Sequence, residues 1–264
     1  MTQALGAMTA AAIEASRIVL EIYRGGGIAR EKADGSPVTE ADEKAEAAIL
    51  SILHEQAPGI PVIAEEAVAN GATPEASDRF FLVDPLDGTK EFVNGTDEFT
   101  VNIALIENGV PVSGVVTVPA TGTLFSGEVG TGATRQQFDF ATGQPDGPAE
   151  AICVRERPQS GVIAMMSRSH GSEETQRMLD ALGVSDVMPA GSSLKFCAIA
   201  EGRADLYPRL GRTMEWDTAA AHAVLKAAGG DVYVFDGQQR GAPLTYGKAE
   251  RGFDNPHFLA VGKE

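Results

Sequence analysis

The spacing of apolar residues in the first part of the chain predicts two amphipathic helices. Apolar side chains recur at helical spacing through residues 2–23, and this run ends at three glycines. A second helical pattern covers residues 38–59. Thr39 is followed three residues later by Asp42, which is the form of a capping box. We therefore expect the second helix to begin at this pair.

The next part of the chain is patterned as strands. Residues 60–66 and 80–83 contain short apolar runs bounded by polar segments, which is typical of buried strands. Residues 99–119 predict two strands joined at an Asn-Gly dipeptide, which favours a tight hairpin turn. Residues 123–137 predict another hairpin.

The second half of the chain alternates between the two patterns. Predicted strands cover residues 161–167, 184–191, 204–209 and 231–237, and predicted helices cover residues 172–183, 193–202 and 216–230. Such alternation is characteristic of helices layered on sheets, so we expect a layered α/β fold. The turn-rich residues 139–151 are the expected boundary between two halves, residues 1–148 and 149–264.

Composition and charge limit the classes of partner. The chain has 264 residues and a formal net charge of −16 at pH 7. This charge argues against binding of a nucleic-acid polymer or an anionic membrane through a broad surface, but a small anion can still bind beside metal ions or local cations. Cys153 and Cys197 are far apart, so we expect two reduced thiols in a reducing cytoplasm. No apolar run approaches the length of a membrane span, and the first helix lacks the basic leader of a signal peptide.

Two carboxylates lie three residues apart at the end of the apolar strand at residues 80–83. One buried charge is costly unless it is paired or binds a metal, and a second like charge adds to that cost. Asp84 and Asp87 therefore predict a site for a hard divalent cation such as Mg²⁺, and Gly88 allows close approach of the backbone. The same residue types also form surface turns. This motif alone supports the metal site and the surface turn about equally.

Acidic residues also stand at the ends of two other elements. Glu65 and Glu66 follow an apolar strand, and Asp217 lies in the first turn of a predicted helix. Each has an ordinary explanation, because a Glu pair at a strand end is usually solvated and the macrodipole stabilises an acid at a helix N-terminus. If four such carboxylates met within ~5 Å, each pair would repel by roughly 3 kcal/mol at an effective dielectric of about 20. One or two Mg²⁺ ions would make such a cluster a phosphate-processing site.

Four motifs, taken in order, resemble one known superfamily. They are PVTEAD, IAEE, DPLDGTKEF and WDTAAAHAV, and their order and spacing are similar to those of the lithium-sensitive, Mg²⁺-dependent sugar phosphatases. That superfamily includes inositol monophosphatases, fructose bisphosphatases and bisphosphate nucleotidases. Residues 191–224 resemble more closely the bacterial 3′(2′),5′-bisphosphate nucleotidases of the CysQ type. The resemblance implies the sugar-phosphatase fold, in which αβαβα layers form one catalytic unit.

The resemblance also implies roles for particular residues. Two or three Mg²⁺ ions would be held by Glu65, Asp84, Asp87, Asp217 and the carbonyl of Leu86, with Asp84 bridging two ions. Asp42 and Thr89 would orient and deprotonate the attacking water, which a bound metal makes nucleophilic near neutral pH. Helix capping remains the alternative for Thr39 and Asp42, and we expect Asp42 to serve both purposes.

Residues for substrate binding are expected mainly in the second half. Ser167 and His170 follow an apolar strand, Ser193 and Lys195 lie at a helix start suited to phosphate, and Arg209 would help to bind a second phosphate. Capping also explains the serine, a solvated helix face explains the lysine, and a lone His is commonly structural. The resemblance adds to this substrate set Glu65, Leu86, Asp87, Gly88, Thr89 and Asp217.

The activity that the resemblance implies is hydrolysis of the 3′-phosphate of 3′-phosphoadenosine 5′-phosphate, giving AMP and phosphate, with inhibition by lithium. The sulfated precursor of this nucleotide is a further expected substrate. We expect a small phosphorylated nucleotide as the partner, no nucleic-acid polymer and no integral membrane segment. The expected location is the cytoplasm, with or without peripheral contact at the inner membrane face. The sequence pattern carries no signal of oligomeric state.

Three alternatives stay open on sequence grounds. An inositol monophosphatase, or another phosphatase of small sugar phosphates, would share the same metal ligands. A haloacid-dehalogenase-type phosphatase would use Asp84 as a nucleophile, although its motif has one residue between the aspartates and this chain has two. An acidic cation-binding module would keep the fold and bind metal without turnover.

Overall fold

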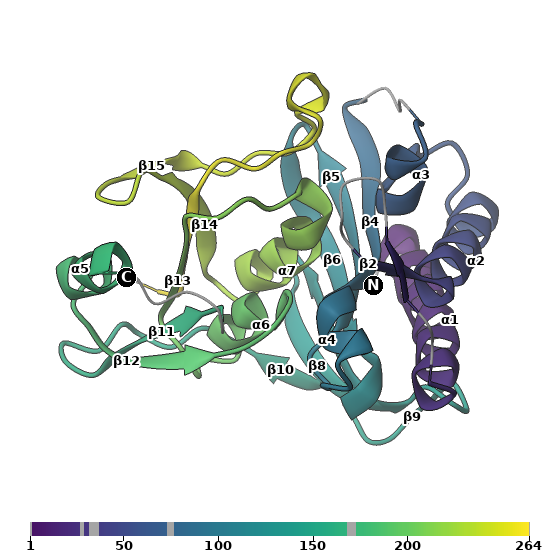
Figure 1. Ribbon diagram of the computed structural model, residues 1–264, viewed down its shortest axis with the longest axis horizontal. Helices are drawn as coiled ribbons and strands as arrows, with labels where there is room; N and C mark the ends of the chain where they lie inside the picture. Colours follow the sequence, from purple (N-terminus) through teal and green to yellow (C-terminus); the bar gives the residue numbers. More distant parts are fainter. Residues whose placement is uncertain (1, 27–28, 32–36, 73–76, 168–172, 264) are drawn as a thin grey trace.

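Helices and sheets alternate in layers in the computed structural model of the chain (Figure 1). The structure describes residues 2–26, 29–31, 37–72, 77–167 and 173–263. From right to left in the figure, the layers are α1 (Gln3–Arg24) with α2 (Glu40–Gln56), the first sheet, α6 (Leu194–Ala200) with α7 (Glu215–Ala227), the second sheet, and α5 (Glu173–Ala181). This order confirms the predicted α/β class and its αβαβα layers.

The first sheet has the strand order β10-β8-β7-β6-β5-β4-β3, with β9 pairing to β8. Its strands are β3 (Val62–Ala64), β4 (Arg79–Asp87), β5 (Thr100–Glu107), β6 (Val110–Val118), β7 (Thr123–Glu128), β8 (Gly132–Asp139), β9 (Gln144–Pro145) and β10 (Glu150–Ile152). β3 and β4 pair in parallel, with Ala64 opposite Val83. Because parallel strands end at the same edge of a sheet, Glu65 and Asp84 follow these two residues at one edge.

The strand β4 is buried on both faces, which explains its continuous apolar run. Phe81 and Val83 belong to the core beneath α1 and α2, whereas Phe80 and Leu82 belong to the core shared with α6 and α7. Successive side chains of a strand point to opposite faces, so a strand between two helical layers needs apolar residues at every position. The polar end of β4 is therefore the exception that requires an explanation.

The hairpin turn predicted between β5 and β6 is confirmed. Asn108 and Gly109 have φ angles of 52° and 78°. A type I′ turn needs positive φ at both central residues, and Asn followed by Gly meets that need at little cost. The turn carries the chain directly from β5 into β6, which pair antiparallel.

Helix α7 lies unusually close to the first sheet. A Cβ atom on Gly114 of β6 would lie 2.3 Å from the carbonyl oxygen of Ala220, and one on Gly127 of β7 would lie 2.7 Å from the Cα of Val224. Only glycine permits this approach of helix and sheet backbones. The close packing fixes the position of α7, whose first turn carries Asp217.

The second sheet has the strand order β12-β11-β13-β16-β14-β15. Its strands are β11 (Val162–Met166), β12 (Val184–Pro189), β13 (Leu206–Arg209), β14 (Asp231–Phe235), β15 (Arg240–Pro243) and β16 (Phe258–Val261). The sequence pattern predicted the first four of these but neither β15 nor β16. β16 has only four residues, and it is defined by antiparallel pairing with β13 and β14 on its two sides. The apolar core on the outer side of this sheet includes Met178 and Leu179 of α5.

Short elements complete the fold. They are the strand pair β1 (Ala29–Glu31) and β2 (Pro37–Thr39), the helices α3 (Glu65–Ala69) and α4 (Thr89–Val93), and 3₁₀ turns at Pro119–Thr121 and Ala249–Arg251. The segment expected to separate the two halves contains β9 and β10, so the first sheet continues to Ile152. Within the described residues, no helix has the length and apolar character needed to cross a membrane. Cys153 and Cys197 are both free.

Candidate active site

The turn at the end of β4 points its polar groups into the edge of the first sheet. The Asp84 Oδ1 atom accepts a hydrogen bond of 2.9 Å from the Leu86 N–H, and the β4–β5 ladder is irregular between Asp84 and Asp87. Gly88 then adopts a φ of +90°, with the Glu98 carbonyl oxygen 3.2 Å from where a Cβ would stand. A residue with a side chain would be strained here, so glycine lets the chain turn directly into α4.

Four acidic residues from three segments of the chain interact at this edge. Burial raises the pKa of Asp84 well above its ordinary value, and the charges of Glu65, Asp87 and Asp217 raise it further. Burial and the charges of Asp87 and Glu65 do the same to the pKa of Asp217. The fold therefore brings together the acids that the sequence places at residues 65, 84, 87 and 217, and their mutual repulsion favours a bound cation.

The chemistry of this donor set suits a hard divalent cation, because every donor is a carboxylate or carbonyl oxygen. The carbonyl oxygen of Leu86 lies in the same turn, 3.2 Å from the Thr89 hydroxyl. Within the described part of the chain, no three His, Cys, Asp or Glu side chains already converge in the arrangement of a formed metal site. The acids thus interact electrostatically without being drawn around a single point.

Asp42 and Thr89 meet although 46 residues separate them in the sequence. The Asp42 Oδ2 atom accepts hydrogen bonds from the Thr39 N–H at 2.7 Å and the Thr39 hydroxyl at 2.8 Å. Its Oδ1 atom accepts a 3.3 Å hydrogen bond from the Thr89 hydroxyl. The capping box predicted for α2 is thus confirmed, and it uses one carboxylate oxygen while the other faces Thr89.

The environment of Asp42 affects its ionisation. Burial raises the pKa of Asp42, the hydrogen bonds from Thr39 oppose the rise, and the charge of Glu66 adds to it. A carboxylate whose pKa is raised is a better proton acceptor than one with an ordinary pKa.

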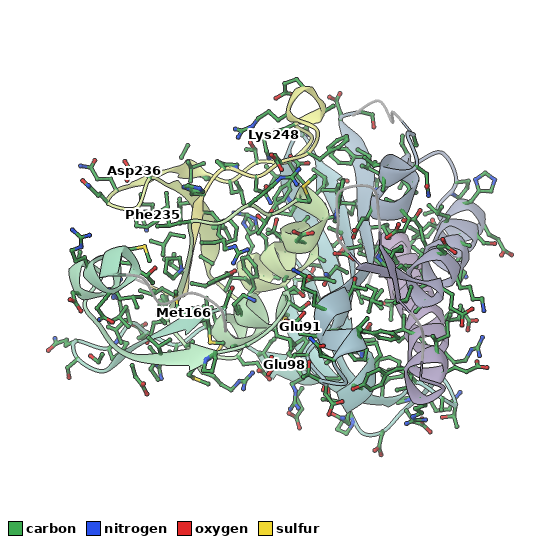
Figure 2. All side chains as sticks on the ribbon, in the orientation of Figure 1. Glu91, Glu98, Met166, Phe235, Asp236 and Lys248 are labelled. Carbon is green, nitrogen blue, oxygen red and sulfur yellow. The ribbon has the colours of Figure 1, made fainter. Side chains whose placement is uncertain are left out.

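A cavity of about 190 Å³ opens between the acids and the start of α6. Asp87 and Asp217 line one part of it, and Lys195, Arg209 and Arg212 line another. Figure 2 labels Glu91, which also lines the cavity, and Glu98, whose Oε2 atom accepts a 2.8 Å hydrogen bond from the Gly191 N–H. The cavity therefore has an acidic part and a cationic part facing the same space.

Lys195 is buried beside this cavity. Its Nζ atom donates to the carbonyl oxygens of Ser192 at 2.5 Å and Ala190 at 3.2 Å, and it lies 5.2 Å from the centre of the Tyr207 ring. Burial lowers the pKa of Lys195 to about 8, although the charge of Asp87 opposes the fall. The charged Lys195 side chain has one further N–H to donate to an anion, and its two bonds order the loop before α6.

Arg209 lies on the same side of the cavity. Its Nη1 atom donates to the Ser167 hydroxyl at 2.9 Å, and its Nη2 atom donates to the Arg212 carbonyl at 3.2 Å. Its Nε atom is buried and has no hydrogen-bond partner among the described residues. An arginine held by two bonds with a donor still unsatisfied is suited to an anionic ligand.

The serines at the start of α6 have different surroundings. Ser192 lines the cavity, and its hydroxyl donates to the Asp87 Oδ2 atom at 2.5 Å. The Ser193 hydroxyl is buried and donates to the Asn102 Oδ1 atom at 2.8 Å. The structure thus places the Ser192 side chain at the cavity and turns the Ser193 side chain toward β5. His170 lies outside the described residues.

Sequence reasoning missed Glu46, Glu91 and Arg212. Glu46 on α2 is buried and accepts 2.8 Å hydrogen bonds from the N–H groups of Glu66 and Ala67, so it supports the start of α3. Burial raises the pKa of Glu46 to about 7. The available signal was its spacing, because residue 46 follows Asp42 by one helical turn on the buried face. The sequence did not point to Glu91 or Arg212, because a charged residue that lines a cavity has the same sequence pattern as one on the open surface.

Comparison with known proteins places the chain in a family. The sequence profile described as the inositol monophosphatase family matches residues 1–258. The chain belongs to this family. Within the inositol monophosphatase family it is 44% identical over 228 residues to the 3′(2′),5′-bisphosphate nucleotidase CysQ of Shigella flexneri, which covers 86% of each protein. It is 43% identical, over the same length and coverage, to CysQ of Escherichia coli strain K12.

Solved structures of the inositol monophosphatase family share the fold. CysQ from Bacteroides thetaiotaomicron matches with a TM-score of 0.79 and 39% identity, covering 98% of this chain and 97% of its own. The inositol monophosphatase from Anabaena (Nostoc) sp. PCC 7120 matches with a TM-score of 0.72 and 26% identity, covering 98% and 90%. The resemblance stated from the four motifs is thus confirmed over nearly the whole chain.

Proposed function

We propose that the chain is a phosphoric monoester hydrolase that removes the 3′-phosphate of 3′-phosphoadenosine 5′-phosphate, giving AMP and phosphate. The observation that carries this proposal is a cavity in which Asp87 and Asp217 of the acid cluster face Lys195 and Arg209. The relatives named as 3′(2′),5′-bisphosphate nucleotidases support it, because their identity of 43–44% extends over 86% of the chain. Acceptance of the sulfated precursor of the nucleotide belongs to the same proposal.

The acid cluster is the proposed metal centre, with Mg²⁺ as the ion and two or three ions in turnover. Its ligands would be the side chains of Glu65, Asp84, Asp87 and Asp217 and the carbonyl of Leu86. Bound Mg²⁺ supplies a water molecule of lowered pKa and stabilises the departing oxygen. The protein contributes oxygen donors whose repulsion a cation relieves.

Asp42 and Thr89 are the proposed proton acceptors. The Thr89 hydroxyl lies 3.3 Å from the Asp42 Oδ1 atom and 3.2 Å from the Leu86 carbonyl oxygen. A hydroxyl has one proton to donate, so donation to Asp42 leaves its oxygen lone pairs able to accept a proton from water. Thr39 holds the other carboxylate oxygen and fixes the orientation of the pair.

The cationic part of the cavity is the proposed site for the second phosphate. Lys195 and Arg209 can each donate to a phosphate oxygen, and Arg209 has a buried unsatisfied Nε. An inositol monophosphate has no second phosphate to pair with these cations, which is why the nucleotide is the favoured substrate. Gly88, Thr89 and Ser167 complete the proposed substrate contacts beside the metal ligands, and the expectation for His170 stays a prediction.

The proposed location is the cytoplasm, where free thiols persist.

Release of phosphate from 3′-phosphoadenosine 5′-phosphate and from inositol 1-phosphate, with purified protein and Mg²⁺, tests the proposal. We expect kcat/KM for the nucleotide to exceed that for the inositol ester by at least about tenfold, which is roughly 1.4 kcal/mol of transition-state discrimination. A tenfold preference for inositol 1-phosphate would make the chain an inositol monophosphatase. Trapping of an aspartyl-phosphate at Asp84 would contradict direct attack by water, and Mg²⁺ binding without turnover would leave only a cation-binding module.

A further inference from the structure

A cluster of hydroxyl groups joins the two sides of the cavity and has no role in the proposed reaction. Thr100, the first residue of β5, lies opposite Asp87 in the β4–β5 ladder. Its hydroxyl is 2.7 Å from the Ser192 hydroxyl and 3.0 Å from the Ser193 hydroxyl, so it links the first sheet to the start of α6. Ser192 in turn is bonded to Asp87.

The direction of these hydrogen bonds follows from counting protons. In the ionised form that would bind a cation, the Asp87 carboxylate only accepts, so the single proton of Ser192 goes to its Oδ2 atom at 2.5 Å. The Ser192 oxygen must then accept from the Thr100 hydroxyl, which lies 2.7 Å from it and 3.2 Å from its other acceptor, the Asn102 Oδ1 atom. The Ser193 hydroxyl, with its own proton, donates to the Asn102 Oδ1 atom. The result is a one-way relay from Thr100 through Ser192 to Asp87.

The backbone of Ser192 has an unfavourable conformation, which the hydrogen bonds of this loop stabilise. Ser192 has a φ of 52°, in the left-handed region that is unfavourable for a non-glycine residue. The Gly191 N–H is held by Glu98, and the Ser192 carbonyl accepts from Lys195. The loop before α6, which leads to Lys195, is therefore fixed by Ser192, the same residue that holds Asp87.

Asn102 supports the same carboxylate from β5. It is 1% exposed and lies opposite Asp84 in the ladder. Burial raises the pKa of Asp87, and the Ser192 hydroxyl, the Lys195 charge and the Asn102 amide oppose that rise. The Asn102 Nδ2 atom nevertheless completes no hydrogen bond within the described residues, which leaves the Ser192 hydroxyl as the side-chain bond that fixes Asp87.

We propose that Thr100 and Ser192 are positioning residues that orient the Asp87 carboxylate through this hydroxyl relay and thereby set the affinity of the acid cluster for a divalent cation. The inference rests on the metal site of the proposed function. Groups that orient a metal ligand without touching the metal typically contribute ten- to a hundredfold to affinity.

Mn²⁺ binding to the metal-free protein, measured without substrate by isothermal titration, tests the relay. We expect Thr100→Val to raise the Kd for Mn²⁺ by about tenfold, and Thr100→Ser, which keeps the hydroxyl, to restore it. Ser192→Ala, a change at the cavity and not in the core, should weaken Mn²⁺ binding similarly. The matched control is Thr117→Val, because the Thr117 hydroxyl is equally buried and lies 2.6 Å from the Ser16 hydroxyl on the far side of the same sheet.

Equal Mn²⁺ affinity in Thr100→Val, Ser192→Ala and the parent protein would overturn the relay while leaving the proposed function in place. A loss of affinity in Thr117→Val as large as that in Thr100→Val would overturn it too, since general destabilisation would then explain both. Absence of Mn²⁺ binding to the parent protein would instead overturn the proposed metal site and the relay with it.

Discussion

At the scale of single residues, the two carboxylate oxygens of Asp42 have different roles. The Oδ2 atom of Asp42 caps α2 through Thr39, and its Oδ1 atom faces Thr89. A capping box needs only one carboxylate oxygen. The sequence therefore shows a capping motif whether or not the second oxygen has a chemical role, and only the contact with Thr89 distinguishes the two cases.

Replacement of Asp42 by Asn is expected to lower kcat by at least about a hundredfold, because the amide keeps the shape of the side chain but is not a proton acceptor of comparable strength. The melting temperature should change by only a few degrees. Asp139→Asn is the matched control, since Asp139 also accepts from a threonine hydroxyl, Thr142, at 2.9 Å but is exposed. A rate within a few-fold of the parent for Asp42→Asn would show that Asp42 only caps the helix.

Asp205 provides a prediction on pH dependence away from the site. Burial alone would raise the pKa of Asp205, but the hydrogen bonds from Arg155 and the Ile163 N–H hold it below its ordinary value. A carboxyl group with a lowered folded-state pKa stabilises the protein above its unfolded pKa of about 3.9 and loses that contribution as pH falls through the folded value.

Asp205→Asn should therefore lower the free energy of unfolding at pH 7 by about 3 kcal/mol, because Arg155 and the Ile163 N–H lose a charged acceptor. The difference from the parent should shrink as pH falls below about 4. Urea unfolding at pH 7, 5 and 3 measures it. A difference that is constant across these pH values would contradict the assigned ion pair.

At the scale of elements, the placement of α7 on the first sheet controls where Asp217 lies. Gly114 and Gly127 let α7 approach β6 and β7 more closely than any residue with a side chain would allow. The hydrophobic pattern predicted α7 itself, because its apolar residues recur at helical spacing. It could not predict how closely the helix and sheet pack, which depends on glycines in two other elements.

Gly114→Ala is expected to destabilise the protein by about 1–3 kcal/mol, because the added Cβ would lie 2.3 Å from the Ala220 carbonyl oxygen. Displacement of α7 should also weaken Mn²⁺ binding through Asp217. The control is Gly6→Ala on α1, where nothing lies within 4 Å of the new Cβ and the helix should be stabilised slightly. Thermal unfolding of both variants gives the comparison, and an unchanged Tm for Gly114→Ala would contradict the close packing.

The limits of sequence reasoning are clearest for short elements. The parallel pair β3–β4 was predicted as two apolar runs, and from it followed the meeting of Glu65 and Asp84. β16 was not predicted, because four residues give too short a pattern and their strand conformation depends on pairing with β13 and β14. Likewise, two adjacent serines look equivalent in a sequence, and only the left-handed backbone of Ser192 decides which hydroxyl reaches Asp87.

At the scale of the whole molecule, a protein with a net charge of −16 is proposed to bind a substrate with several negative charges. Local features resolve this conflict, because Lys195, Arg209 and Arg212 line the cavity and the acid cluster is expected to carry cations. The motifs that identified the family come from three layers of the fold, which explains why no single motif distinguished a metal site from a turn.

Mg²⁺ should stabilise the whole protein, since relief of repulsion among buried acids is available only in the folded state. We expect saturating Mg²⁺ to raise the Tm of the metal-free protein, and removal by EDTA to abolish turnover and reverse the rise. Li⁺ at millimolar concentration should inhibit turnover in the presence of Mg²⁺, as the family resemblance implies. Turnover that persists in EDTA would contradict a metal-dependent mechanism.

The most direct test of the account is an anomalous-difference map from crystals soaked in Mn²⁺ and AMP. The account predicts Mn²⁺ peaks within coordination distance of oxygen atoms of Asp84, Asp87, Asp217 and Glu65. Peaks only elsewhere on the protein, with these four side chains still apart, would contradict the claim that acids from distant segments form one metal centre.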